Sequence, residues 1–131
     1  MSTRSAIGIK NNDGFITGVY CHFDGYLEHN GEILKKVYNT ENKVKELLSF
    51  GDMSILKEQI YPKKNHTFDN PEEDVCIFYH RDRGEAWEDT APLGFDTEKE
   101  FTDYYDWSAY YYLFDNGQWY WKTKNSEWNK L

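Results

Sequence analysis

The chain has 131 residues and a net charge of −8, and it carries five Trp, eleven Tyr and eight Phe side chains. This length suits one α+β domain, residues 1–131, whose core relies heavily on aromatic rings. No apolar run approaches the roughly 20 residues that cross a bilayer, and the opening residues lack the hydrophobic stretch of a secretory signal. We therefore expect a cytoplasmic protein without membrane contact, in which Cys21 and Cys76 remain reduced.

The acidic excess is concentrated in one segment. Residues 69–106 contain 13 acidic and 3 basic side chains, whereas the rest of the chain contains 10 acidic and 12 basic ones. A negative field repels nucleic-acid phosphates and attracts basic protein surfaces. The segment therefore predicts a basic protein partner and no direct nucleic-acid binding. A solvated acidic face that aids solubility is the simpler interpretation.

The first 24 residues predict a β-hairpin. Ile7 and Ile9 alternate with smaller or polar residues, and residues 11–14 (Asn-Asn-Asp-Gly) supply the turn. The return strand runs from Phe15 to about Phe23, and alternation assigns its side chains to two faces. The predicted core face carries Phe15, Val19, Cys21 and Phe23, and the opposite face carries Ile16, Tyr20, His22 and Asp24.

Two helices are expected next. Asn30 is a candidate N-cap for the first helix and Thr40 for the second. Gly51 is suited to end the second helix in a left-handed conformation. Residues 53–60 predict one further helical turn, and residues 61–73 predict a loop. The buried stripes are expected to be Ile33, Leu34 and Val37 in the first helix and Val44, Leu47 and Leu48 in the second.

The second half of the chain combines short elements with a clear hairpin. The expected elements are a strand over 75–80, a charged turn over 81–85, an anchored loop over 86–96 and a short helix over 97–105. The Asn116-Gly117 pair predicts a type I′ turn between strands 110–114 and 119–123. Together the elements predict an antiparallel sheet of about five strands, made of two terminal hairpins and one central strand, packed with two to three short helices.

Cysteine and histidine occur together in two predicted strand segments, as Cys21 and His22 and as Cys76 and His80. Such a set could supply a Cys₂His₂ zinc site. Adjacent Cys21 and His22 point to opposite faces of a strand, so this spacing argues against convergence on one ion. We expect both cysteines to be small buried hydrophobes, and we predict no metal and no cofactor.

His22, Asp24 and His80 are the candidate catalytic residues if the protein is an enzyme. A carboxylate beside an imidazole fixes its tautomer and raises its basicity, as general-base catalysis requires. No nucleophile elbow or phosphate-binding Gly-rich loop accompanies them, and a hydrogen-bonded structural cluster is the competing interpretation. In the alternative of a small-ligand or nucleotide-binding protein, the pocket residues are Tyr20, His22, Asp24, Tyr26, Tyr79 and His80.

Aromatic residues crowd the end of the acidic segment and the C-terminal hairpin. Ring packing that compensates for few aliphatic side chains is one interpretation. Exposed Tyr and Trp are also the preferred anchors of protein interfaces. The predicted partner-binding surface consists of Glu72, Glu73, Asp74, Glu85, Trp87, Glu88, Asp89, Trp107 and Tyr111.

Residues 1–9 (Met-Ser-Thr-Arg-Ser-Ala-Ile-Gly-Ile) and 19–26 (Val-Tyr-Cys-His-Phe-Asp-Gly-Tyr) resemble motifs of a family of small proteins of unknown function, encoded mainly by bacteriophages, prophages and other mobile elements. Segments 69–73, 79–85 and 112–115 are also similar to that family. The resemblance implies no activity, cofactor or catalytic residue. It implies an accessory protein in the host cytoplasm that inhibits or modulates a host defence or nucleic-acid-handling protein.

Overall fold

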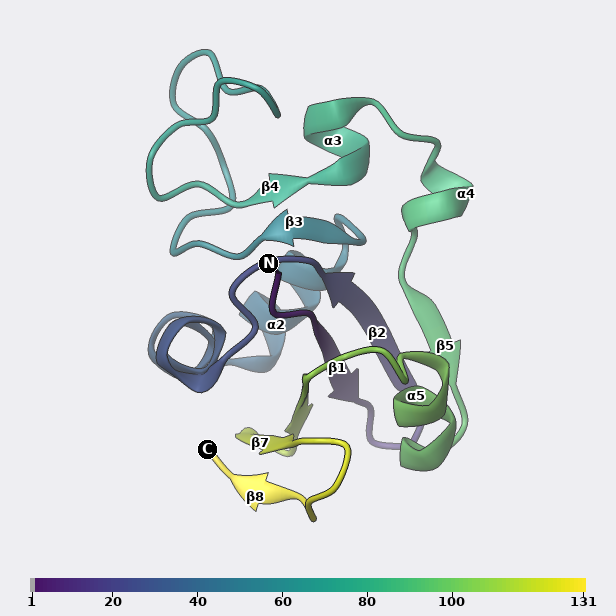
Figure 1. Ribbon diagram of the computed structural model, residues 1–131. Helices are drawn as coiled ribbons and strands as arrows, with labels where there is room; N and C mark the ends of the chain where they lie inside the picture. Colours follow the sequence, from purple (N-terminus) through teal and green to yellow (C-terminus); the bar gives the residue numbers. More distant parts are fainter. Residues whose placement is uncertain (1) are drawn as a thin grey trace.

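The computed structural model describes residues 2–131, which form a mixed β-sheet with helices packed against it (Figure 1). The strand order is β4-β3-β2-β1-β6-β7-β8, and β5 pairs with β2 off this path. Strands β1 and β2 are antiparallel, whereas β1 with β6 and β2 with β3 are parallel pairs. The strands are β1 (Ser5–Lys10), β2 (Ile16–Cys21), β3 (Met53–Ile55), β4 (Ile77–Phe78), β5 (Leu93–Phe95), β6 (Tyr110–Asp115), β7 (Gln118–Lys122) and β8 (Asn129–Lys130).

Helices lie on both faces of the sheet. One core contains side chains of α1 and α2, and a second core contains Phe101 of α5 together with Ala6, Ile16 and Tyr111 of the strands. None of the helices within residues 2–131 combines the length and apolarity needed to cross a membrane. The helices are η1 (Leu27–Gly31, a π-helical turn), α1 (Glu32–Lys36), α2 (Glu41–Leu48), α3 (Tyr79–Arg83), α4 (Trp87–Thr90) and α5 (Glu98–Tyr104).

Two facing glycines allow α5 to pack closely on the sheet. Gly8 of β1 pairs with Gly18 of β2, and the Phe101 ring lies over both. A Cβ atom at Gly18 would lie 2.6 Å from the Phe101 ring, which is closer than two carbon atoms can approach. The absence of side chains here therefore places α5 and the residues that follow it against β2.

The structure confirms the α+β class and several local predictions. Asn116 and Gly117 have φ angles of 51° and 82°, as a type I′ turn requires. The Thr40 hydroxyl accepts a hydrogen bond from the Lys43 N–H at 3.3 Å and caps α2. Gly51 follows α2 in a left-handed conformation with φ of +81°. Hairpin turns and caps were predictable because their geometry depends on a few adjacent residues.

The prediction of about five antiparallel strands was wrong, because the described residues form eight strands in a mixed sheet. Residues 53–60 do not form a helical turn, since Met53–Ile55 is strand β3. β3 also pairs with the residues that follow β2. The His22 and Phe23 N–H groups donate to the carbonyls of Met53 and Ser54 at 3.1 and 2.9 Å. Residues 53–55 are thus extended because the backbone N–H groups at the end of β2 need hydrogen-bond acceptors. The spacing of apolar residues in 53–60 does not reveal this requirement.

The predicted strand over 75–80 and loop over 86–96 also need correction. Only Ile77–Phe78 forms a strand, while Val75 makes an isolated β-bridge to Gln59. Tyr79–Arg83 forms helix α3, which ends at left-handed Gly84. Residues 86–96 contain helix α4 and strand β5 rather than a loop. These elements are two to five residues long, so none is long enough to show a period in the sequence.

The predictions for the first helix and for the two faces of β2 were wrong in part. Asn30 is not an N-cap: it lies inside η1, fully buried, and its amide donates to Ser5 Oγ at 3.1 Å. Val19 and Cys21 are buried as predicted, but Phe15 and Phe23 are exposed. Ile16, expected on a non-core face, is also fully buried because α5 covers that face of the sheet.

Candidate functional site

Strand β2 changes its outer partner midway, and Asp52 fills the gap. β5 pairs with Ile16–Gly18, and β3 pairs with β2 at Cys21. Between them, the Tyr20 N–H donates to Asp52 Oδ1 at 2.9 Å. The Asp52 N–H donates to the Thr90 carbonyl at 2.7 Å and fixes the end of α4 to this point. A carboxylate therefore replaces a strand at the split between β3 and β5.

A cleft of about 150 Å³ lies at this split, and we call it the aromatic cleft. It brings together residues of β2, α4, β5 and the end of α5, which are far apart in the sequence. No Lys or Arg is among its lining residues. They are Tyr20, Asp52, Glu88, Asp89, Ala91, Leu93, Tyr104, Tyr105 and Trp107.

Three tyrosines surround Trp107 in the cleft. The ring centroids of Tyr20, Tyr104 and Tyr105 lie 6.1, 6.1 and 5.8 Å from that of Trp107, at interplanar angles of 61°, 59° and 65°. Rings inclined in this way form the walls of a concave corner rather than a flat stack. Tyr104 and Trp107 remain 51% and 45% exposed, whereas Tyr105 is buried. The aromatic surface is therefore open to a partner from one side.

The electrostatic character of the cleft is acidic. Burial raises the pKa of Asp52 to about 6, the Tyr20 N–H bond opposes that shift, and Glu85 adds to it. Glu88 and Asp89 occupy the first turn of α4 and are exposed at the rim. Burial also raises the pKa of Tyr20 to about 12, so its hydroxyl stays neutral at neutral pH. The ring walls therefore remain uncharged while the carboxyl groups supply the negative charge.

The predicted catalytic residues have separate partners. His22 Nδ1 lies 2.5 Å from the Tyr20 hydroxyl, and burial together with Arg4 lowers the pKa of His22. His80 Nδ1 instead lies 2.7 Å from the Glu85 carbonyl oxygen, and its ring packs on Trp87 at 5.2 Å. Asp24 adopts a positive φ of 57° in the turn after β2. No hydrogen bond or ion pair within residues 2–131 joins His22 to Asp24 or His80.

The tyrosines of the predicted ligand pocket are also divided. Tyr20 lines the aromatic cleft, whereas Tyr26 is exposed and pairs with the His29 ring at 6.2 Å. Tyr79 packs against Phe68 at 6.0 Å. Of the predicted pocket, only Tyr20 contributes to the aromatic cleft.

Both cysteines are buried free thiols. Cys21 Sγ lies 3.5 Å from the Asn30 amide nitrogen, and burial raises the pKa of Cys21 to about 12. Cys76 Sγ donates to the Lys57 carbonyl at 3.3 Å and lies 3.2 Å from the Lys57 N–H. Within residues 2–131, no three His, Cys, Asp or Glu side chains are grouped to hold a metal ion. The two thiols belong to the hydrophobic core that contains α1 and α2.

The predicted partner-binding surface is divided between two regions. The 61–74 loop, which carries Glu72, Glu73 and Asp74, lies on the opposite side of the molecule from α4 and α5 (Figure 1). The Glu72 carboxylate is also engaged locally, because it accepts from the Lys63 and Lys64 N–H groups at 3.0 Å each. These three acids therefore do not share a face with the aromatic cleft.

Tyr111 does not belong to any exposed surface. It is only 2% exposed, and its hydroxyl donates to the Tyr105 carbonyl at 2.8 Å. Glu85 lies 3.6 Å from Arg83 in a partly exposed ion pair. Trp87 is 41% exposed on α4 beside Glu88. The region that keeps exposed rings and acids together is thus α4 and the end of α5.

Sequence reasoning missed Asp52 as a site residue. Tyr104 and Tyr105 belong to the aromatic run considered as interface anchors, but the predicted partner-binding surface did not include them. Asp52 carries no motif, since it simply follows the glycine that ends α2, and its role depends on the split in the sheet. A buried contact between His66 and Asp82 was also missed. His66 Nδ1 accepts from the Glu72 N–H at 2.9 Å, and its Nε2 lies 3.4 Å from Asp82, outside hydrogen-bond geometry. The His66 side chain has no exposed surface, so this contact anchors the loop. Asp82 also lines a hollow of about 300 Å³ together with Thr67, Phe68, Asp69 and Arg83.

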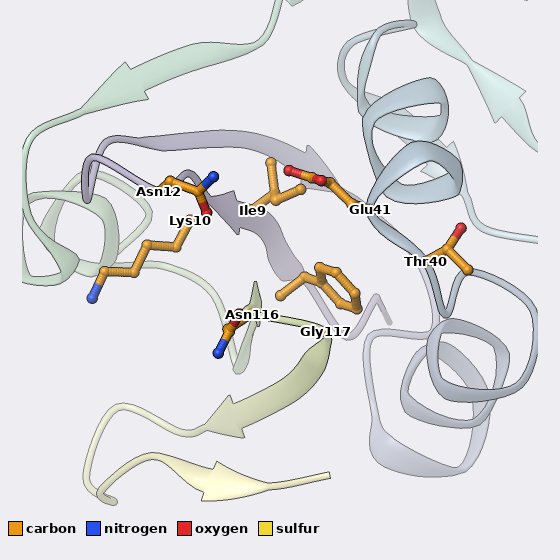
Figure 2. A pocket seen from close by; sticks show the side chains of 8 residues that line it. Ile9, Lys10, Asn12, Thr40, Glu41, Asn116 and Gly117 are labelled. Carbon is orange, nitrogen blue, oxygen red and sulfur yellow. The ribbon is translucent and has the colours of Figure 1, made fainter.

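A larger hollow of about 300 Å³ lies between the two hairpin turns and the start of α2 (Figure 2). Its charged side chains are already paired: Lys10 with Glu98 at 2.8 Å and Glu41 with Lys45 at 3.1 Å. Figure 2 shows Lys10 directed away from Glu41 and Thr40. The hollow offers no unpaired charged side chain, so we take the aromatic cleft as the stronger candidate site.

Comparisons with protein-family models, with curated proteins and with solved structures found no match to this chain. The candidate site therefore rests on the geometry and chemistry described above.

Proposed function

We propose that the protein is a non-enzymatic binding protein whose acidic, aromatic surface on α4 and the end of α5 binds a basic surface of a partner protein. We call this surface the α4–α5 surface and define it as Trp87, Glu88, Asp89, Tyr104 and Trp107. The observation that carries the proposal is the exposure of three large rings, 41%, 51% and 45% for Trp87, Tyr104 and Trp107, among carboxylates.

Exposed rings of this kind suit an interface. Burying a Trp or Tyr removes a large apolar area from water at little cost in side-chain entropy, and such residues dominate binding energies. Glu88 and Asp89 are exposed, so they retain their long-range field and can steer a basic partner toward the rings. Rings thus supply affinity and carboxylates supply orientation and association rate.

We further propose that the partner is a host protein that handles nucleic acid, including defence nucleases. Such proteins have basic grooves that bind phosphate backbones, and an array of carboxylates can occupy such a groove. The exposed acids Glu88 and Asp89 on the α4–α5 surface and the resemblance of residues 1–9 and 19–26 to phage-encoded proteins support this choice. In this proposal the protein acts as an accessory factor in the host cytoplasm.

The alternative of a nucleotide-binding protein or small enzyme has less support. Sites for cofactors and drug-sized ligands typically enclose about 300–1,000 Å³, whereas the aromatic cleft encloses about 150 Å³. The candidate general base His22 and its expected neighbour His80 have different partners. The volume of the aromatic cleft and the different partners of His22 and His80 therefore do not favour this second function. The hollow of about 300 Å³ between the hairpin turns is large enough for a ligand, but none of the predicted pocket residues lines it.

The proposal is tested by affinity capture from host lysate at about 50 mM and about 500 mM salt. We expect a basic partner to be retained at low salt and released at high salt. The double reversal Glu88→Lys with Asp89→Lys should abolish capture. The matched control is Glu28→Lys with Glu32→Lys, which changes the net charge equally at exposed positions of η1 and α1, away from α4 (Figure 1). Equal capture by both variants, or capture that does not depend on salt, contradicts the proposal.

A further inference from the structure

The aromatic cleft combines two features that favour a cation. Tyr20, Tyr104, Tyr105 and Trp107 line it together, and the face of an aromatic ring attracts a cation within about 6 Å of its centroid. Asp52, Glu88 and Asp89 line the same cleft. Rings and carboxylates on one concave surface recognise a group that is both positively charged and partly apolar, which describes an alkylammonium group.

One residue of the cleft, Tyr105, also carries a buried polar atom. Tyr105 is 2% exposed and lines the cleft, yet its hydroxyl has no hydrogen-bond partner among residues 2–131. A buried hydroxyl without a partner costs stability. Asp52 is close enough to contribute to the raised pKa of Tyr105.

We propose that the aromatic cleft binds the side-chain ammonium group of a lysine on the basic partner protein. The inference rests on the proposed function and specifies its central contact. The lysine methylene groups pack on Trp107 and Tyr104, and the ammonium group lies near Asp52 with Glu88 and Asp89 at the rim. Lysine suits this geometry because its stem is apolar and its charge is compact.

The size of the cleft agrees with a single side chain. An apolar cavity of about 150 Å³ is large enough for one benzene-sized group, and the aromatic cleft has about this volume. A planar guanidinium also binds aromatic faces, but the ammonium group of lysine is a more compact charge and suits a cleft of this volume better. The Arg4 side chain lies close enough to lower the pKa of Tyr20, but Arg4 does not line the cleft. In this proposal the cation therefore belongs to another molecule, since no Lys or Arg lines the cleft.

The test is an NMR titration of the full chain with capped lysine (Nα-acetyl-lysine methylamide) at low salt. The matched ligand is its Nε-acetylated form, which has a similar stem and no charge. We expect saturable shifts of the Trp107 indole N–H, with a Kd on the order of 10 mM or tighter. The acetylated form should bind at least about threefold more weakly. Equal shifts from both ligands overturn the proposal.

Substitutions in the aromatic cleft test whether capped lysine binds there. Trp107→Ala, Tyr104→Ala and Asp52→Asn should each weaken capped-lysine binding at least about threefold. Because Trp107→Ala removes the indole signal, its binding is followed by the backbone N–H shifts of Tyr20 and Leu93, which also line the cleft. Tyr61→Ala is the control, because Tyr61 is a 55% exposed ring outside the cleft. Tyr104 is also exposed by half, so its substitution keeps the test valid if the Trp107 variant does not fold. Saturable binding that survives both the Tyr104 and Asp52 substitutions overturns the proposal.

Partner capture and capped-lysine binding together separate this inference from the proposed function. If a basic partner is captured and released by salt, but capped lysine does not bind, the cleft proposal fails and the proposed function stands. If capped lysine binds the cleft and no basic partner is captured, the proposed function fails and the cation site stands alone.

Discussion

Asp52 Oδ1 accepts a hydrogen bond from the Tyr20 N–H at 2.9 Å, at the point where β2 leaves β5 and meets β3. This bond satisfies a backbone group that no strand reaches. It also places a carboxyl group on the floor of a cleft walled by aromatic rings. The carboxyl group that pairs with the free Tyr20 N–H of β2 thus also lies at the acidic centre of the candidate site.

The first prediction concerns the pH dependence of stability. The folded protein raises the pKa of Asp52 from 3.8 to about 6, so it binds this proton more tightly than the unfolded chain does. The contribution of Asp52 to stability is therefore greatest below about pH 4, falls as the pH rises toward about 6 and is constant above that. We expect the loss to amount to about 1–2 kcal/mol, because the carboxyl is partly open to solvent.

Asp52→Asn provides the comparison for that prediction. The Asn carbonyl can still accept from the Tyr20 N–H, but it carries no charge that burial disfavours. Urea unfolding of both proteins between about pH 4 and pH 7 should show a stability difference that grows in favour of the variant as the pH rises. Other titrating groups are common to both proteins and cancel in this difference. A difference that is independent of pH contradicts the assigned shift.

The second prediction concerns the packing of α5 on the sheet. Gly18→Ala adds a Cβ atom at a point 2.6 Å from the Phe101 ring, so the ring or the helix must move. We expect a loss of about 1–3 kcal/mol in the free energy of unfolding, measured by urea denaturation. Phe101→Leu should recover part of that loss when it is combined with Gly18→Ala, since the smaller side chain leaves room. Strictly additive effects argue against this clash.

The third prediction concerns the anchor of the 61–74 loop. Asp82 Oδ2 accepts from the Phe78 N–H at 2.8 Å, and Asp82 Oδ1 accepts from Arg81 Nε at 2.9 Å. Asp82→Ala leaves both donors without this acceptor, so we expect a loss of about 2–4 kcal/mol. Hydrogen exchange should accelerate most in the loop, where the Phe68 N–H donates to the Asp82 carbonyl. The control is Asp69→Ala, at an exposed position of the same loop.

The fourth prediction concerns the two thiols. Cys21 and Cys76 are buried, and burial raises the pKa of both, so little reactive thiolate is accessible in the folded protein. We expect a disulfide reagent to modify them at least about 100-fold more slowly in the native protein than in urea. Fast reaction of either thiol with the native protein contradicts the packing described.

Local chemistry in the sequence was sufficient for the elements that adjacent residues define. The Asn116-Gly117 turn, the Thr40 cap and the Gly51 terminus were predicted correctly, because each depends on the conformational preferences of one or two residues. The helix over 97–105 was predicted for a similar reason, and its Thr97 hydroxyl accepts from the Glu100 N–H at 3.1 Å. The concentration of acids in residues 69–106 was also visible in the sequence alone.

The sheet and the site depended on tertiary structure. Strands as short as Met53–Ile55 and Leu93–Phe95 are extended because β2 offers them hydrogen-bonding partners, and no pattern within three residues encodes that. Asp52 was missed because its role depends on pairing with Tyr20, which is far away in the sequence. Tyr111 was wrongly expected on the surface because only the packing of α5 on the sheet buries it. The sequence by itself determined the turns, the caps and the charge distribution. Long-range pairing decided which rings became buried and which acids came to lie beside the exposed ones.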